Sequence, residues 1–274
     1  MSTARETQIQ YWNEQAGRTW VDMQPWLDRQ LAPLGERAMA ALAPMAGENL
    51  LYIGCGCGDT TRRLGMLVGA GGTVLGIDIS APMLAAARTA VNAHNVSFAE
   101  RDAQKARFDA PFDAAFSRFG VMFFADPVVA FANIRAALRS GGRIAFVCWR
   151  GAAENPWMMV PLAAALRFLP PPAPVDPHEP GPFAFADADR LRGVLNEAGF
   201  SRIAIDPFNT EIGGFGLDEA LSLALRVGPL GKLLRETPGQ QERVVAAVRA
   251  ALAGHIDDGI VRLASGTWIV AASC

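Results

Sequence analysis

The sequence lacks a large excess of charge of either sign. Lys and Arg number 25 against 27 Asp and Glu in 274 residues, so the formal net charge is −2 at pH 7. Such a chain presents no overall positive field to a phosphate backbone or to an anionic membrane surface. We therefore do not expect nucleic acid to be a partner of this protein.

The sequence also lacks a long apolar run. No stretch approaches the roughly 20 apolar residues that a membrane-spanning helix needs, and residues 1–15 are polar where a secretory signal would be apolar. We expect no membrane span and a cytoplasmic location. Hydrophobic residues make up 51% of the chain and charged residues 19%, which is typical of a folded protein and not of a disordered one.

Cysteine is scarce and is not arranged for metal binding. The four cysteines are Cys55, Cys57, Cys148 and Cys274. They are too few for a disulfide framework in a chain of this length, and Cys55-x-Cys57 has no second Cys or His pair at the spacing of metal ligands. We expect free thiols, which fit a reducing compartment, and no metal site.

The sequence does contain a regular alternation of strand and helix patterns. Up to residue 46, apolar residues recur at three- and four-residue intervals, which predicts a helix with one buried face formed by Leu27, Leu31, Leu34, Ala38 and Leu42. After Gly47, short apolar runs alternate with helical patterns, as in a parallel sheet with crossover helices. The expected strands are 49–53, 73–77, 96–99, 113–117, 143–149, 202–207 and 267–272, and the expected helices include 59–68, 127–139, 187–198, 217–225 and 240–252.

Two further features of the sequence indicate where helices begin and where regular structure is absent. Ser80 is the expected N-cap of the helix that follows the second strand. Seven prolines between Pro170 and Pro182 are incompatible with helix or central strand, so we expect an irregular surface segment there.

A glycine-rich turn, Gly54-Cys55-Gly56-Cys57-Gly58, directly follows the first expected strand. Glycines let a ligand approach the backbone, and the next helix offers free N–H groups and the positive end of its dipole. Asp78 ends the second strand, where a carboxylate can accept hydrogen bonds from both hydroxyls of a ribose. Glycines alone are equally compatible with a tight turn that binds nothing, whereas the two features together favour a nucleoside-binding crevice.

These motifs resemble those of the class I S-adenosylmethionine-dependent methyltransferases, especially the bacterial small-molecule type grouped with quinone-biosynthesis C-methyltransferases. The similarity covers about residues 45–150 and rests on the glycine turn and on segments 74–80, 100–103, 112–119 and 139–143. It implies S-adenosylmethionine as cofactor and S-adenosylhomocysteine as product. The reaction it implies is methyl transfer to an O, N or C nucleophile of a small, apolar molecule.

The resemblance also implies a fold. It is an α/β, Rossmann-like, doubly wound seven-stranded sheet of order 3-2-1-4-5-7-6 with strand 7 antiparallel. We expect a single methyltransferase domain with a helical lid (1–45), a cofactor-binding core (46–150), an insertion after strand five (151–186) and a C-terminal part with a helical insertion and the last strand (187–274). No oligomeric state follows from the sequence.

Roles for individual residues follow from the same resemblance. Asp78 would hold the ribose, Asp102 would receive the adenine amino group, and the Ala103 N–H would reach the adenine ring. The end of the fourth strand would face the methionine part. The expected cofactor-binding residues are Tyr52, Gly54, Cys55, Gly56, Gly58, Asp78, Ile79, Asp102, Ala103, Ser117 and Arg118. Asp78 as a helix cap, Asp102 as a turn residue and Arg118 as a salt-bridge partner remain alternatives.

Tyr52 departs from the family pattern. The family usually has Asp or Glu at this place, where the carboxylate braces the glycine-rich loop and helps to receive the ammonium group of the methionine part. A tyrosine is neutral at pH 7 and cannot supply that charge. Three interpretations stay open: the contact comes from elsewhere, the site is weakened, or the tyrosine was introduced into the chain. We expect weaker but real cofactor binding.

The sequence does not identify a catalytic residue. Methyl transfer relieves the sulfonium charge, so alignment in a dry pocket can supply most of the catalysis. If a base exists, Glu154 in the loop after strand five is the candidate. The expected substrate-binding residues are Trp20, Phe119, Trp149 and Trp157, although a tryptophan such as Trp20 is also a common core residue.

Two other classes of function use a related fold. One is a protein of this fold that binds the cofactor but has lost turnover. The other is an NAD-type oxidoreductase, which is disfavoured because Asp59 stands where the NAD-binding fingerprint has its third glycine.

Overall fold

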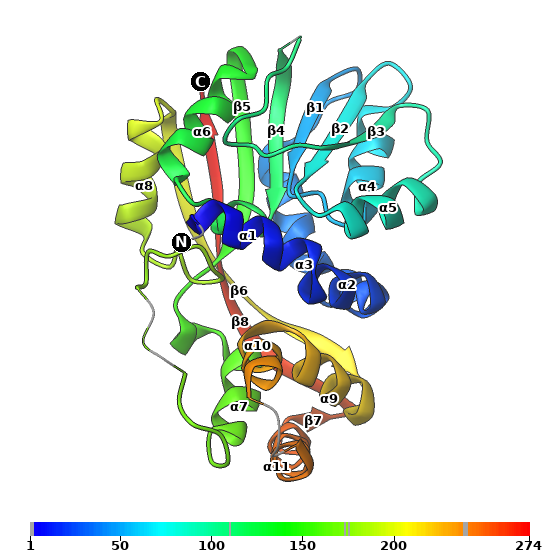
Figure 1. Ribbon diagram of the computed structural model, residues 1–274. Helices are drawn as coiled ribbons and strands as arrows, with labels where there is room; N and C mark the ends of the chain where they lie inside the picture. The colour runs from blue at the N-terminus through cyan, green and yellow to red at the C-terminus, as the bar shows by residue number, and fades with distance from the viewer. Residues whose placement is uncertain (1–2, 110, 173, 175, 238–240) are drawn as a thin grey trace.

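The computed structural model of the protein describes residues 3–109, 111–172, 174, 176–237 and 241–274. Its centre is one sheet in the order β3-β2-β1-β4-β5-β8-β6, with β7 paired to β8 (Figure 1). Strands β1 to β5 are parallel, whereas β8 runs antiparallel to both β5 and β6. The strands are β1 (Asn49–Ile53), β2 (Thr73–Asp78), β3 (Val96–Glu100), β4 (Phe112–Arg118), β5 (Leu138–Trp149), β6 (Ser201–Phe215), β7 (Ile256–Asp257) and β8 (Ile260–Ser273).

This order confirms the predicted doubly wound sheet, with β8 as the antiparallel strand between β5 and β6. Crossover helices link β1 to β2, β2 to β3 and β4 to β5, whereas the described residues between β3 and β4 form no helix. The helices are α1 (Ala4–Asn13), α2 (Gln15–Asp22), α3 (Gln24–Leu42), α4 (Asp59–Val68), α5 (Ala81–Ala90), α6 (Pro127–Ala136), α7 (Pro156–Ala165), α8 (Ala188–Glu197), α9 (Leu217–Arg226), α10 (Gly228–Glu236) and α11 (Gln241–Ala253). The first residue of the expected helix 240–252 lies outside the described residues.

The N-terminal segment forms three consecutive helices. Figure 1 shows α1 and α2 between the parallel strands above and helices α7, α9, α10 and α11 below. Helix α3 packs on β4, β5, β6 and β8, and all five apolar residues of its predicted stripe are buried. Each buried leucine of this kind contributes about 1.5–3 kcal/mol. Helix α3 is therefore part of the core and positions everything attached to it.

Two strands are longer than predicted. The expected segments 202–207 and 267–272 are only the parts of β6 and β8 that lie beside β5. Both strands continue as a long antiparallel pair that carries α9, α10 and α11 (Figure 1). Their extension packs against a second apolar cluster that includes Leu230, Val244 and Leu263. Sequence periodicity missed this extension because most of β6 is exposed or half-buried, so the apolar contrast between its two faces is weak.

Two local predictions were right only in part. The helix expected over 127–139 ends at Ala136, because Leu138 already pairs with Phe112 at the start of β5. Ser80 occupies the N-cap position of α5, but its hydroxyl makes no capping hydrogen bond and instead donates to the Trp12 carbonyl oxygen at 2.7 Å. The Ala81 N–H donates to Asn13 Oδ1 at 2.8 Å. The start of α5 is thus capped from the N-terminal helices.

Other features of the sequence agree with the structure. The described part of the proline-rich segment is irregular and mostly exposed, as predicted; residues 173 and 175 lie outside the described residues. The four cysteines are free. Among the described helices, none is both long and apolar enough to cross a membrane.

Arg143 of β5 fastens α3 to the sheet. Its guanidinium donates to the carbonyl oxygens of Leu42 and Ala43 at the end of α3, and to both carboxylate oxygens of Glu48 at 2.7 and 2.8 Å. The Glu48 side chain is only 7% exposed. The hydrogen bond from Arg143 holds the pKa of Glu48 below its usual value, and burial opposes this effect only in part.

Replacing Glu48 with Gln removes this charge partner, and we expect it to lower the free energy of unfolding at pH 7 by about 1–3 kcal/mol. A carboxyl group with a lowered folded-state pKa stabilises above its unfolded pKa and loses that contribution as pH falls through the folded pKa. The difference between the two proteins should therefore shrink below about pH 4. Urea unfolding between pH 7 and pH 3 measures it.

The exposed pair of Asp218 with Arg249 provides the control for this experiment. Asp218→Asn should change stability by less than about 0.5 kcal/mol. A Glu48→Gln effect that stays constant with pH would contradict the role given to the ion pair.

Candidate cofactor site

The glycine-rich loop after β1 forms one wall of a pocket at the carboxyl ends of the strands. Gly54, Gly56 and Gly58 have φ of +68°, +54° and +88°, a region open to glycine at little cost. A Cβ on Gly54 would lie 2.7 Å from the Cα of Gly120. The loops after β1 and β4 therefore touch backbone to backbone, and only glycine fits at this contact.

Asp78 at the end of β2 lies under this loop. Its Oδ2 accepts a hydrogen bond from the Gly56 N–H at 2.8 Å, and its Oδ1 accepts one from the Ser80 N–H at 2.9 Å. Asp78 is 8% exposed. Burial raises the pKa of Asp78, and the backbone N–H donors oppose that rise. The Ile79 N–H is a third backbone donor, and a carboxylate has about four acceptor sites, so the group keeps acceptor capacity for a ligand hydroxyl.

Asp102 lies on the same pocket, after β3. It accepts a hydrogen bond from the Gln104 N–H at 2.9 Å and forms an ion pair with Arg5 of α1. Ala103 and Ile79 line the pocket as well. The pocket thus gathers the predicted residues that follow β1, β2 and β3.

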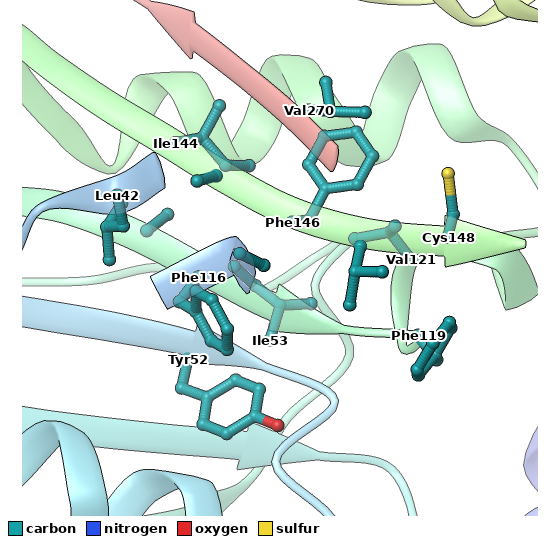
Figure 2. Close-up of a cluster of buried hydrophobic side chains, with 14 of the residues drawn as sticks. Leu42, Tyr52, Ile53, Phe116, Phe119, Val121, Ile144, Phe146, Cys148 and Val270 are labelled. Carbon is teal, nitrogen blue, oxygen red and sulfur yellow. The ribbon is translucent and has the colours of Figure 1, made fainter. Parts of the chain in front are cut away.

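Tyr52 is buried and is one of the residues that line the pocket. Figure 2 shows its ring against Phe116, and the two ring centroids are 5.3 Å apart with the planes at 69°. Burial raises the pKa of Tyr52 to about 12, although Arg118 and a hydrogen bond from Thr60 act in the opposite direction. The phenol is therefore neutral at physiological pH.

Arg118 at the end of β4 forms an ion pair with Asp28 of α3, with Nη2 and Oδ1 2.7 Å apart. Their side chains are 12% and 21% exposed, and both line the pocket. Sequence reasoning missed Asp28. The available signal was an acidic residue inside the apolar stripe of an amphipathic helix.

Phe119 and Trp20 are the two predicted substrate-binding residues that line this pocket. Phe119 has φ of +63°, a conformation that costs a non-glycine residue about 1–3 kcal/mol and that often marks functional sites. Figure 2 shows Phe119 beyond the end of β4, apart from the packed rings of Tyr52 and Phe116. Its ring stacks on Trp149 with centroids 4.1 Å apart.

Four predicted site residues lie elsewhere. Ser117 is fully buried, and its hydroxyl donates to the Ile53 carbonyl oxygen at 2.8 Å, so it braces β4 against β1. Trp149 lies behind Phe119, and Trp157 packs on Trp149. Glu154 pairs with Arg150 and accepts a hydrogen bond from the Gly151 N–H. None of these four lines the pocket as far as the chain is described.

Trp157 lines a second, mostly apolar cavity beneath α7 and α9, together with Gln30 of α3. The Trp157 Nε1 and the Gln30 Nε2 are buried, and neither has a hydrogen-bond acceptor among the described residues. Buried donors of this kind are costly unless an oxygen atom reaches them.

This fold, with a pocket at the carboxyl ends of parallel strands, is typical of α/β proteins that bind a nucleoside-type cofactor. Comparison with known proteins identifies the family. The family described as "Methyltransferase domain" matches residues 50–142. An O-methyltransferase of Penicillium expansum is 31% identical over 217 residues, which cover 76% of this chain and 71% of that protein. The chain belongs to the class I S-adenosylmethionine-dependent methyltransferases.

Other relatives agree with this assignment. Aklanonic acid methyltransferase of Streptomyces sp. (strain C5) is 38% identical over 118 residues, 42% of this chain and 54% of that protein. Demethylmenaquinone methyltransferase of Staphylococcus saprophyticus is 28% identical over 63% of this chain and 78% of its own length. The chain thus spans about half of the first of these proteins and more than two thirds of the second. The family uses S-adenosylmethionine, so the oxidoreductase alternative is removed.

A solved structure supports the fold. Phosphoethanolamine N-methyltransferase 2 of Haemonchus contortus, in complex with phosphomonomethylethanolamine and S-adenosylhomocysteine, matches with a TM-score of 0.54. The match has 18% sequence identity and covers 88% of this chain and 52% of the other. At this identity the likeness concerns the fold alone.

The contact between Gly54 and Gly120 predicts a specific sensitivity. A Cβ on Gly120 would lie 2.9 Å from the Gly54 Cα and from the Ile53 carbonyl oxygen. Gly120→Ala should therefore lower the free energy of unfolding by about 1–3 kcal/mol and weaken binding of S-adenosylhomocysteine. Urea unfolding and calorimetric titration measure the two effects.

Gly193 of α8 provides the matched control, because a Cβ there meets no atom within 4 Å. Gly193→Ala should stabilise the protein by up to about 1 kcal/mol and leave ligand affinity unchanged. Equal effects of the two substitutions would contradict the proposed contact between the loops.

Proposed function

We propose that this protein transfers the methyl group of S-adenosylmethionine to an O, N or C nucleophile of a small, largely apolar molecule. The observation that carries the proposal is the single pocket in which the glycine-rich loop, Asp78 and Asp102 meet. Support comes from relatives whose names specify aklanonic acid, demethylmenaquinone and O-methylation. For the methyl acceptor of this chain we propose a chemical class, a small and largely apolar molecule, and no individual compound.

The order of the strands gives the proposed orientation of the cofactor. Adenine lies at Asp102 and Ala103 after β3, and the ribose hydroxyls lie at Asp78 after β2. The methionine part then lies toward Arg118 at the end of β4, since β1 and β4 follow β2 in the sheet. Phe119 lies at the same end and lines the pocket, so the acceptor approaches the methyl group there, with Trp20 on the lid side.

The reaction proposed is a direct displacement. A lone pair of an O or N acceptor, or the π pair of an enol carbon, attacks the methyl carbon, and the carbon–sulfur bond breaks with its electrons moving to sulfur. The products are the methylated acceptor and the neutral thioether S-adenosylhomocysteine. The proton of the acceptor leaves to solvent before or after the transfer. The sulfonium charge disappears in this step, so a water-poor pocket favours it.

The titratable groups of the pocket are poorly suited to act as a base. Burial raises the pKa of Cys57 to about 12 and that of Cys55 well above its usual value. The neutral Tyr52 is no base at neutral pH, and Asp28 and Asp102 are engaged in ion pairs. Glu154 pairs with Arg150 away from the pocket. We therefore propose catalysis by alignment and desolvation.

Asp78→Asn tests the cofactor site. It removes one of the two carboxylate oxygens and the negative charge, so affinity for S-adenosylhomocysteine should fall on the order of tenfold to a hundredfold. Isothermal titration calorimetry measures this. Asp126 caps α6 by accepting from the Val129 N–H outside the pocket, and Asp126→Asn is the control with unchanged affinity. Unchanged affinity in Asp78→Asn would place the cofactor elsewhere.

A methyl-transfer assay with labelled S-adenosylmethionine and a panel of phenols, enols and hydroxyquinones tests the reaction. Because no base is proposed, the midpoint of the pH–rate profile should follow the pKa of each acceptor rather than one enzyme group. A midpoint shared by acceptors of different pKa would indicate an enzyme base. Cofactor binding without any turnover across the panel would favour the alternative of a binding protein.

A further inference from the structure

The methionine end of the proposed cofactor site contains an ion pair from two distant parts of the chain. Asp28 comes from α3 in the N-terminal segment, and Arg118 comes from the end of β4. Their charged atoms are 2.7 Å apart, and both side chains are largely buried. Both also line the pocket with the glycine-rich loop, so a bound ligand can reach each of them.

The Asp28 carboxylate lies close to the loop and to Tyr52. Burial is the main cause of the raised pKa of Cys57, and the negative charge of Asp28 is the next. The same charge acts on Tyr52 in the direction that raises its pKa. A carboxylate from α3 therefore faces the region where Tyr52 of β1 offers only a neutral phenol.

Helix α3 contacts the Arg118 side chain at Gly35. Gly35 lies seven residues after Asp28, two helical turns along the same face. A Cβ on Gly35 would lie 3.0 Å from the Cδ of Arg118. The arginine stem thus lies against the helix at its glycine, and its guanidinium reaches Asp28.

The ligand's methionine part carries an ammonium and a carboxylate on one carbon atom. We propose that Asp28 binds that ammonium, supplying the carboxylate that β1 lacks at Tyr52, while Arg118 binds the ligand carboxylate. The assignment rests on the proposed function and on the orientation given there. The ion pair and the zwitterion then form a square of alternating charges, so neither protein charge is left unpaired when the ligand binds.

The arrangement makes Asp28 a positioning and specificity-determining residue. It selects ligands with an intact amino acid end over 5′-methylthioadenosine, which lacks that end. It also ties the cofactor to α3, and α3 leads through α2 to Trp20 and Trp12 on the pocket wall. The sequence predicted a weakened site because Tyr52 is neutral. In the proposal, Asp28 of α3 supplies the acidic group instead of a residue of β1.

The test is a cycle of protein and ligand changes measured by calorimetry. The probes are S-adenosylhomocysteine, its deaminated analogue, its decarboxylated analogue and 5′-methylthioadenosine. Asp28→Asn should weaken S-adenosylhomocysteine on the order of tenfold to a hundredfold. It should change binding of the deaminated analogue and of 5′-methylthioadenosine by less than about threefold. Arg118→Gln should weaken S-adenosylhomocysteine but not the decarboxylated analogue.

Two further variants control for indirect effects. Asp28→Glu keeps the charge and should recover most of the affinity for S-adenosylhomocysteine. Asp22 of α2 pairs with Arg226 outside this pocket, so Asp22→Asn should leave all four affinities unchanged. Undiminished binding of 5′-methylthioadenosine to Asp28→Asn shows that the variant is folded with its nucleoside site intact.

The outcomes separate this proposal from the proposed function. Equal losses for S-adenosylhomocysteine and its deaminated analogue in Asp28→Asn would overturn the assignment of Asp28 and leave the cofactor site standing. An unchanged affinity for S-adenosylhomocysteine in that variant would overturn it as well. No binding of S-adenosylhomocysteine to the unaltered protein would overturn the proposed function and this inference together.

Discussion

One buried carboxylate, that of Asp78, holds together the two loops on which the site depends. It accepts hydrogen bonds from the Gly56 N–H and the Ser80 N–H, so it fixes the turn after β1 to the start of α5. The same α5 start is held from the other side by Asn13 and by the contact of Ser80 with Trp12. Burying this carboxylate costs free energy because it loses its hydration. Its backbone N–H donors do not fill all of its hydrogen-bond acceptor sites, so acceptor capacity remains. A ligand with two hydroxyl groups satisfies that capacity, which links the stability of the loops to the proposed ribose site.

The parallel core was predictable because its signals are local. Strand β1 and helix α4 begin and end at the predicted residues, since apolar runs, glycines with positive φ and a helical stripe all act within a few residues. The extension of β6 and β8 was not predictable in the same way. Residues after Pro207 pair with β8 and pack on helices far along the chain, and such tertiary contacts leave little periodicity in the strand itself. The end of α6 at Ala136 is a similar case, because pairing of Leu138 with Phe112 overrides a helical pattern.

The residues of the candidate site also fall into two groups, those that local motifs predict and those that only the tertiary fold brings to the pocket. Gly54, Asp78 and Asp102 stand at strand ends, so a motif locates them and the fold then brings them to one pocket. Asp28 and Arg5 reach that pocket from helices that carry no such motif. Trp149 and Glu154 were predicted from their positions at and after the end of β5, yet Trp149 stacks on Phe119 and Glu154 pairs with Arg150. A strand end predicts which edge of the sheet a residue occupies, but not whether its side chain faces the pocket.

The contribution of the N-terminal helices changes how the reaction is understood. The parallel core supplies the glycine-rich loop and Asp78, and the N-terminal helices add two ion pairs, Arg5 of α1 with Asp102 and Asp28 of α3 with Arg118. Both pairs join the N-terminal segment to the proposed cofactor site, at its adenine and methionine ends. Arg5, Trp12, Trp20 and Asp28 of the N-terminal segment all line the pocket. In the proposed site, the contacts that bind the cofactor also exclude water and orient the methyl group. Under these conditions alignment of the two reactants can supply most of the catalysis.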